Sequence, residues 1–199
     1  MLAVYAHDLG IDVWEAIDAA ATKPFGFMKF TPGPGVGGHC LPIDPSYLSW
    51  TVRQRLGRSF RFVELANDIN DHMPDYVASR LMRALNRQGV ALSRAKVLVL
   101  GLAYKRNAGD ARESPAVALI HRLLADGAEV SVADPHVVER MPTDALTRRV
   151  ELSKRELERA DAVVLVTDHD AFDYDLVTAH AVLVLDTRHR LDGPHVEQL

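Results

Sequence analysis

The stretch KVLVLGLAY, residues 96–104, decides the fold class of this chain. It is a continuous apolar run with strand-forming valines, and such runs are typical of strands that are buried on both faces. A strand with one face in water would alternate apolar and polar residues instead. The stretch therefore predicts a central strand of a parallel sheet with helices on both sides.

Helix and strand patterns alternate after this stretch. Residues 114–127 carry helix boundaries, with Ser114 as the N-cap, Pro115 at the first helical position and Gly127 as the terminator. The other predicted elements are a strand in AEVSVADP (128–135), a helix in KRELERA (154–160), a strand in DAVVLVTDH (161–169), and a helix followed by a strand in DLVTAHAVLVLDT (175–187). Such alternation predicts βα units on a parallel sheet, and hence an α/β, Rossmann-like, doubly wound unit.

The first half of the chain has helical patterns. Residues 3–22 predict two short helices separated at Gly10, and a long loop is predicted over residues 24–46. A compact domain seldom keeps so long a loop without a functional reason. The change to strand patterns near residue 92 predicts a helical domain over residues 1–92 and a nucleotide-binding α/β domain over residues 93–199.

An apolar stripe follows the long loop. The pattern is helical again from Tyr47, and over residues 61–89 apolar residues recur at steps of three and four from Phe62 to Leu85. Pro74 is expected to kink or divide this helix because proline cannot donate in the helix interior. A stripe of this length must be covered, which predicts a homodimer.

Composition excludes several classes of protein. The 199 residues are 48% apolar and 25% charged, with a formal net charge of −4 and a pI near 6.1. Without a broad basic field, nucleic acid and anionic membranes are poor partners. No apolar run approaches the roughly 20 residues that span a bilayer, and the start lacks the basic region of a signal peptide, so a cytoplasmic protein is expected.

The only cysteine of the chain, Cys40, ends the stretch GPGVGGHC, residues 33–40. Gly37 and Gly38 keep side chains away from the thiol and would let backbone N–H groups face a ligand, as an oxyanion or phosphate site requires. Asp44, held between two prolines, would aim a carboxylate at the same point. A buried structural cysteine is the common alternative, but the combination favours a thiolate that attacks a carbonyl.

Histidines add no clear base or metal site. His39 is adjacent to Cys40, and adjacent residues on an extended chain point in opposite directions, so a cysteine hydrolase is the weaker interpretation. The nine histidines show no H-x-x-x-H pattern and the chain has no C-x-x-C. No metal site is therefore expected.

A second candidate site is GLAYKRNAGDARESP, residues 101–115, between the first strand and the first helix of the α/β half. Ligands of open α/β sheets bind at the carboxyl ends of strands, where a helix N-terminus favours anions. Lys105, Arg106 and Arg112 add positive charge there. The stretch is either a solvated basic loop or a site for nucleotide phosphates, and it lacks the G-x-G-x-x-G fingerprint of dinucleotide binding.

On these two motifs, essentially the whole chain resembles the C-terminal portion of the UDP-glucose/GDP-mannose dehydrogenase family. Residues 22–50, TKPFGFMKFTPGPGVGGHCLPIDPSYLSW, are similar to the active-site segment of the branch that oxidises UDP-N-acetylhexosamines, such as UDP-N-acetylmannosamine or UDP-N-acetylglucosamine. Residues 101–116, GLAYKRNAGDARESPA, resemble the opening of the UDP-binding domain. Glucose-type members carry a lysine where this chain has Ile43, which favours the N-acetylhexosamine branch.

The resemblance implies a role for each matching residue. Cys40 would capture the C6 aldehyde as a thiohemiacetal and carry the thioester after the second hydride transfer, and Asp44 would assist proton and water handling in its hydrolysis. Lys23 matches a region from which the family extends a basic residue toward the substrate of a neighbouring subunit. Gly35, Gly37 and Gly38 would shape the substrate loop, and Lys105 would contact the sugar nucleotide. Arg112 would contact the pyrophosphate region as a cofactor-binding residue. Arg188 would close on the substrate from the last strand.

The resemblance also implies NAD as the cofactor and a UDP-N-acetylhexosamine as the substrate. Family members begin with an NAD-binding Rossmann domain and a long helix with a catalytic lysine and asparagine, and no residue here matches that lysine or supplies the glycine fingerprint. Because hydride transfer requires the nicotinamide to be held against the reacting carbon, this chain alone is expected to be inactive. The alternative is a non-catalytic, dimerising remnant that still binds a nucleotide.

Overall fold

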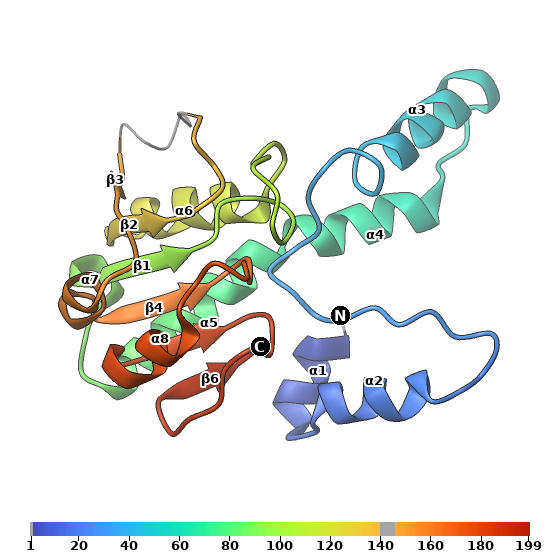
Figure 1. The fold of residues 1–199 in the computed structure, drawn as a ribbon. Helices are drawn as coiled ribbons and strands as arrows, with labels where there is room; N and C mark the ends of the chain where they lie inside the picture. Colours follow the sequence, from blue (N-terminus) through green and yellow to red (C-terminus); the bar gives the residue numbers. More distant parts are fainter. Residues whose placement is uncertain (1, 140–145) are drawn as a thin grey trace.

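The computed structural model describes residues 2–139 and 146–199, and within them a six-stranded parallel sheet forms the centre of the second half (Figure 1). The strand order is β3-β2-β1-β4-β5-β6, and each neighbouring pair is parallel. The strands are β1 (Lys96–Leu100), β2 (Glu129–Ala133), β3 (Arg148–Arg149), β4 (Ala162–Leu165), β5 (Val184–Asp186) and β6 (Val196–Gln198). The predicted α/β class is confirmed, while the short edge strands β3 and β6 were not predicted.

Helices cover both faces of this sheet. They are α5 (Met73–Arg87), α6 (Pro115–Ala125), α7 (Lys154–Arg159) and α8 (Tyr174–His180). Val97 and Val99 of β1 share a core with α5 and α6, whereas Leu98 and Leu100 share a second core with α7 and α8. Successive strand residues point to opposite faces, so all four are buried, which explains the unbroken apolar run of β1.

The predicted boundaries of α6 are confirmed. The hydroxyl oxygen of Ser114 accepts a hydrogen bond from the amide of Ala116 at 3.2 Å, and Pro115 occupies the first turn. The helix ends at Ala125, and Gly127 has a φ of +88°, a conformation that glycine adopts without strain. These signals place the N-terminus of α6 at the carboxyl edge of the sheet, next to the end of β1.

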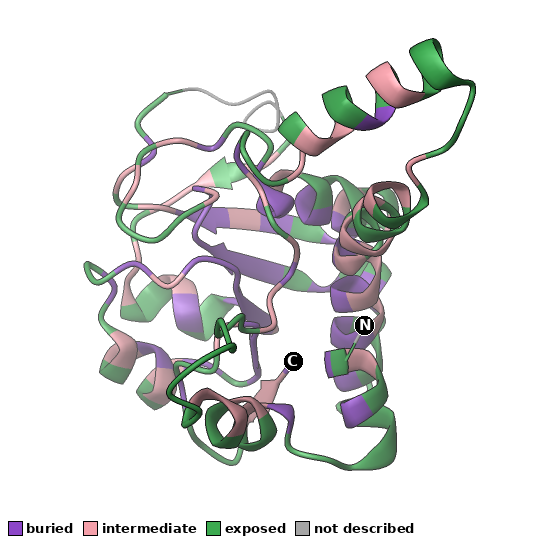
Figure 2. Ribbon diagram, turned by 90° about the vertical axis from the view of Figure 1, so that its right-hand side faces the viewer, coloured by how far each residue is buried: buried purple, intermediate pink, exposed green. Residues whose placement is uncertain are grey.

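Four α-helices come before α5 in the described part of the chain. They are α1 (Leu2–Leu9), α2 (Val13–Ala21), α3 (Asp44–Leu56) and α4 (Arg61–Asp71). The break near Gly10 is as predicted, but α3 begins three residues before Tyr47 because Pro45 fits its first turn. Helices α3 and α4 form a hairpin that projects away from the sheet and is mostly exposed (Figures 1 and 2). None of the helices in the described residues is long and apolar enough to cross a bilayer.

The predicted apolar stripe divides into two parts with different surroundings. His72 separates α4 from α5, and Pro74 lies in the first turn of α5, which confirms the expected division. The stripe of α5 faces the sheet core, where Leu81 and Leu85 are fully buried and Met73 and Tyr76 are partly buried. By contrast, Phe62 of α4 is 81% exposed, so only this first part is left for another molecule to cover.

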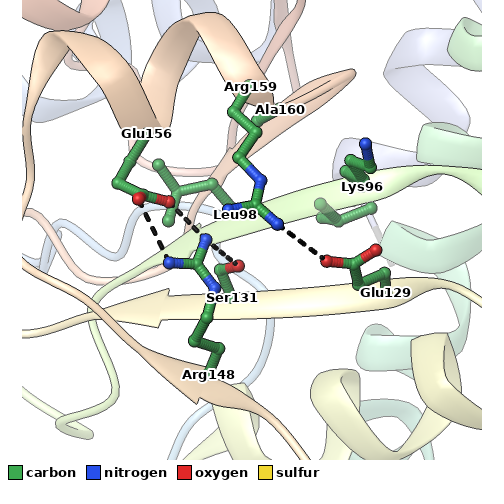
Figure 3. A pocket seen from close by; sticks show the side chains of 9 residues that line it. Lys96, Leu98, Glu129, Ser131, Arg148, Glu156, Arg159 and Ala160 are labelled. Atoms are coloured by element: carbon green, nitrogen blue, oxygen red, sulfur yellow. Dashed lines mark hydrogen bonds and ion pairs between the residues drawn. The ribbon is translucent and has the colours of Figure 1, made fainter.

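Ion pairs close the amino edge of the sheet (Figure 3). Arg148 pairs with Glu156 and donates to the hydroxyl of Ser131 at 3.2 Å, while Arg159 lies 3.6 Å from Glu129. The guanidinium of Arg148 lowers the pKa of Glu156 below its usual value. The space among these side chains is about 10 Å³, no more than a single water occupies, so this edge is structural.

Candidate functional site at the carboxyl edge of the sheet

The carboxyl edge holds the candidate site. The strand order reverses between β1 and β4, and ligands of open α/β sheets bind at such a point, outside the carboxyl ends of the strands. Residues 101–114 leave β1 here and are called the β1 exit loop below. Residues 33–40 of the first half, called the glycine loop, reach the same edge.

Asp134, directly after β2, fixes the start of the β1 exit loop. One carboxylate oxygen accepts hydrogen bonds from the amides of Leu102 at 2.6 Å and Ala103 at 3.0 Å, and also contacts a ring nitrogen of His169 at 3.0 Å. The other oxygen accepts from two amides of its own loop. Burial alone would raise the pKa of Asp134, but these hydrogen bonds outweigh it and hold the pKa well below its usual range.

The exit of β1 does not fit the pyrophosphate of NAD. In a dinucleotide site, glycines after the first strand leave backbone N–H groups free for the phosphates. Here the amides of Leu102 and Ala103 are already occupied by Asp134. Gly101, with a φ of +91°, packs so closely on Thr167 that a Cβ would lie 2.5–2.7 Å from its atoms. The space that the pyrophosphate requires is therefore filled by protein.

The glycine loop docks on the β1 exit loop. A Cβ on Gly37 would overlap the carbonyl oxygen of Glu113 and lie 2.9 Å from Cβ of Tyr104, and one on Gly38 would lie 2.8 Å from the Tyr104 ring. A Cβ on Gly33 would lie 2.8 Å from Nη1 of Arg188. The glycines thus permit close approach between two segments far apart in sequence. The side-chain positions of Gly37 and Gly38 are taken up by Tyr104 and Glu113. That their backbone N–H groups face a ligand stays a prediction.

Asn70 of α4 holds the other side of the glycine loop. Its side-chain oxygen accepts from the amide of Val36 at 2.6 Å, and its nitrogen donates to the carbonyl of Val36 at 3.1 Å. This pair satisfies both backbone groups of Val36, as a strand neighbour would. Gly35 completes the contact, since its Cβ would lie 3.0 Å from Pro115. The loop is therefore held between α4 and the start of α6.

Two open hollows flank the glycine loop, and Val36, Pro42 and Asn70 line both. One, of about 490 Å³, extends to the start of α6 and includes Arg112. The other, of about 600 Å³, is mostly apolar and includes Arg188. A ligand with a charged part could reach a cation from either side of the loop.

The predicted nucleophile lies just outside these hollows. Cys40 is exposed, in a turn whose carbonyl at His39 accepts from the amides of Ile43 at 3.0 Å and Asp44 at 3.3 Å. Asp44 is exposed in the first turn of α3. Lys23 is exposed in the segment after α2, and its ammonium makes no hydrogen bond or ion pair with any described residue. The structure thus keeps Cys40 and Asp44 on one turn but does not join Lys23 to them.

The predicted cations occupy different positions around the edge. Lys105 is exposed, lines neither hollow, and its ammonium makes no hydrogen bond or ion pair within the described residues. Arg112 is also exposed, and its guanidinium forks onto Asp110, which lowers the pKa of that carboxyl to about 2. An exposed pair of this kind contributes little to stability. Arg112 thus lines the first hollow while it is paired with Asp110.

Arg188 is the most enclosed of these cations. It follows β5 and not the last strand, because β6 comes after it. Its Nε donates to the carbonyl of Val166 at 2.6 Å, and its amide donates to Asp186 at 2.7 Å. Burial lowers the pKa of Arg188, although Asp168 and Asp186 oppose the shift, and a guanidinium remains charged at neutral pH. It presents a fixed positive charge beside Gly33.

Sequence reasoning missed the residues that hold the site together. Asn70, Tyr104, Asp134 and His169 were not singled out. Asp134 had a signal, since it directly follows a buried strand in AEVSVADP, at the edge where parallel strands end. Tyr104 and His169 share this signal, since they end the predicted strand stretches 96–104 and 161–169. Asn70 had none, because its partner Val36 lies 34 residues away in the sequence.

These features define a doubly wound α/β unit with a helical half docked on the carboxyl edge of its sheet, the edge where proteins of this architecture bind their ligands. Residues 98–193 match the family model described as "UDP-glucose/GDP-mannose dehydrogenase family, UDP binding domain". Residues 1–72 match the model of the same family's "central domain". The chain belongs to this family.

Several known proteins are similar along most of the chain. The UDP-N-acetyl-D-mannosamine dehydrogenases of Methanococcus maripaludis and Pyrococcus horikoshii are 36% and 39% identical over 83% and 85% of this chain. The chain covers 35% and 37% of their lengths, so it spans little more than a third of each. A solved structure of the NDP-N-acetyl-D-galactosaminuronic acid dehydrogenase of Methanosarcina mazei, 26% identical, aligns with a TM-score of 0.85 over all of this chain and 45% of that one.

The close contact between the glycine loop and the β1 exit loop predicts that a methyl group added at Gly37 will disrupt the docking. Gly37→Ala should displace residues 33–40 from the β1 exit loop, because the new Cβ would overlap a backbone carbonyl that cannot move freely. We expect amide hydrogen exchange in residues 33–40 to accelerate by about tenfold or more, with little change in the sheet strands. Val36→Ala is the control, since its side chain is half exposed. Equal protection of Gly37→Ala and the unaltered chain would contradict this role.

Proposed function

We propose that this chain forms part of an NAD-dependent UDP-sugar 6-dehydrogenase that oxidises the C6 alcohol of a UDP-N-acetylhexosamine to the uronic acid. The observation that supports it best is the docking of the Cys40-bearing loop on the β1 exit loop. That contact brings a free thiol to the edge where a parallel sheet binds nucleotides. The similar UDP-N-acetyl-D-mannosamine dehydrogenases favour UDP-N-acetylmannosamine as the sugar nucleotide.

Cys40 would carry the acyl group in this reaction. Its thiolate adds to the C6 aldehyde formed by the first oxidation, which gives a thiohemiacetal, and loss of a hydride from that carbon leaves a thioester. Water then attacks the thioester, releasing the carboxylate and the thiol. Asp44, on the same turn, would accept the proton of that water. NAD would accept the hydrides and, since the exit of β1 does not fit its pyrophosphate, we place its binding outside residues 1–199.

The nucleotide would be held by the cations of the carboxyl edge. Arg112 borders one hollow beside the glycine loop and Arg188 borders the other, so a diphosphate and its sugar could lie across the loop. Lys105 is free to join from the β1 exit loop because no described residue neutralises its ammonium. Charge-assisted hydrogen bonds from such groups are stronger than neutral ones.

Binding of UDP tests this assignment. The double variant Lys105→Ala, Arg112→Ala should lower UDP affinity by about tenfold or more, because it removes two charged donors to the phosphates. Calorimetry at low and at physiological salt gives the measurement, and the weakening should be larger at low salt. The matched control is Arg94→Ala, Arg159→Ala, which removes the same charge from the amino edge. A folded, unaltered chain that gives no heat with UDP would remove the nucleotide role.

Dimerisation through the first half is the second part of the proposal. The α3–α4 hairpin and the segment before it expose large apolar side chains, including Phe25, Met28, Trp50, Phe62 and Leu65. Monomeric proteins rarely expose apolar surface of this extent, and it marks interfaces. A second copy of the chain would cover it and could bring Lys23 to the neighbouring site.

Sedimentation should show a dimer for the unaltered chain. Phe62→Glu with Leu65→Glu should shift it to a monomer, because two charges would be buried in the apolar contact without partners. Val182→Glu is the control, since Val182 is 57% exposed but lies on the sheet unit. A monomer for the unaltered chain at tens of micromolar would overturn the proposed dimer.

Production of NADH separates the enzyme from the non-catalytic, nucleotide-binding remnant, since both bind UDP. With NAD and UDP-N-acetylmannosamine, residues 1–199 alone should give no NADH, whereas addition of a family member's NAD-binding domain should restore it. Cys40→Ala should lower that restored rate by about 100-fold or more, because the thioester cannot form. Failure of every complementing domain, with UDP binding intact, would favour the remnant.

A further inference from the structure

His169 lies in the segment that follows β4, and each nitrogen of its ring makes one hydrogen bond. Together these two hydrogen bonds determine which ring nitrogen carries the proton. Its ring is fully buried, with Nε2 3.0 Å from a carboxylate oxygen of Asp134 and Nδ1 2.9 Å from the amide nitrogen of Asn107. A carboxylate can only accept and a backbone amide can only donate. Nε2 therefore carries the proton and Nδ1 is an acceptor, so His169 is a neutral imidazole in a single tautomer.

The remaining surroundings of the ring leave no other partner for its nitrogens among the described residues. The rings of His136 and Phe172 meet it edge-on, with centroids 4.8 and 5.6 Å away, and the hydroxyl of Tyr174 donates to the His169 carbonyl at 2.8 Å. The charged neighbours beyond Asp134 are Asp168, Asp170 and Arg106, and Arg106 forms an ion pair with each of the two aspartates. Among the described residues, Asp134 and Asn107 are thus the hydrogen-bond partners of the two ring nitrogens of His169.

The hydrogen bond from the amide of Asn107 to Nδ1 connects the β1 exit loop to His169. Asn107 has a φ of +56°, which is uncommon for a residue other than glycine and must be held by its surroundings. Its side chain also exchanges two hydrogen bonds with Asp170, at 2.6 and 2.9 Å. Lys105 lies two residues earlier and is exposed, and its ammonium has no partner among the described residues. The place of its backbone therefore depends on the anchoring of Asn107.

We propose that His169 is a positioning residue for nucleotide binding. It would link the exits of β1, β2 and β4 through Asn107, Asp134 and its own backbone, so that Lys105 meets the phosphates from a fixed loop. His169 is buried and does not touch the ligand. This proposal rests on the proposed function for the role of Lys105, but not for the anchoring of the loop.

Two substitutions separate the two ring nitrogens. The side-chain oxygen of His169→Asn occupies the place of Nδ1 and can still accept from Asn107, whereas the amide of His169→Gln reaches the place of Nε2 and can donate to Asp134 but leaves Asn107 without its acceptor. Both variants lose the same ring and should lose similar stability, which urea unfolding will show. They differ in the acceptor for Asn107.

Hydrogen exchange and calorimetry then give the decisive readouts. Amides of residues 105–108 should exchange about fivefold to tenfold faster in His169→Gln than in His169→Asn, and UDP should bind more weakly by a similar factor, as expected for one lost hydrogen bond. Nitrogen-15 spectra of the unaltered chain should show His169 with its proton on Nε2. A proton on Nδ1, or equal exchange in the two variants, would overturn the proposal.

The outcome for the proposed function is read separately. If the unaltered chain binds no UDP, the nucleotide role fails, and the exchange rates and the tautomer alone decide whether His169 anchors the loop. If UDP binds but both variants lose affinity equally, while exchange differs between them, the nucleotide role stands and His169 does not position Lys105.

Discussion

The carboxylate of Asp134 is the contact on which the arrangement of the ligand edge depends. It accepts hydrogen bonds from the two amides that follow β1 and from the ring of His169. Although its side chain is buried, these hydrogen bonds lower its pKa and so favour the ionised form. A buried carboxylate is costly unless its lone pairs are satisfied. The hydrogen bonds to Asp134 satisfy those lone pairs and fix the start of the β1 exit loop. Farther along this loop, Tyr104 and Glu113 contact the glycine loop.

The same constraint separates this sheet from a dinucleotide-binding one. Both have parallel strands whose order reverses beside β1. Here the reversal point is filled by Gly101 against Thr167, and Arg112 and Arg188 lie farther out, each lining one of the two hollows beside the glycine loop. The structure thus separates the reversal point, which protein fills, from the open hollows at the rim.

The stability of the two halves has different sources. The sheet is covered on both faces, and α5 contributes its apolar stripe to that core. The α3–α4 hairpin has almost no buried residue of its own and extends from the sheet (Figure 2). Its attachment relies on Asn70 and the glycine loop within the chain, and on whatever covers Phe62 and its apolar neighbours.

Local signals in the sequence determined the parallel sheet, the helix boundaries around Ser114 and Pro74, and the two motifs that gather at one edge. These are consequences of side-chain period, capping and proline geometry, which act within a few residues. The sequence alone did not show that α5 packs on the sheet, or that Tyr104 and Glu113 lie against Gly37 and Gly38. Only the tertiary structure decided those points, because each depends on a close contact between segments that chain spacing leaves unspecified, and the same glycine serves an open pocket or a tight packing contact equally well.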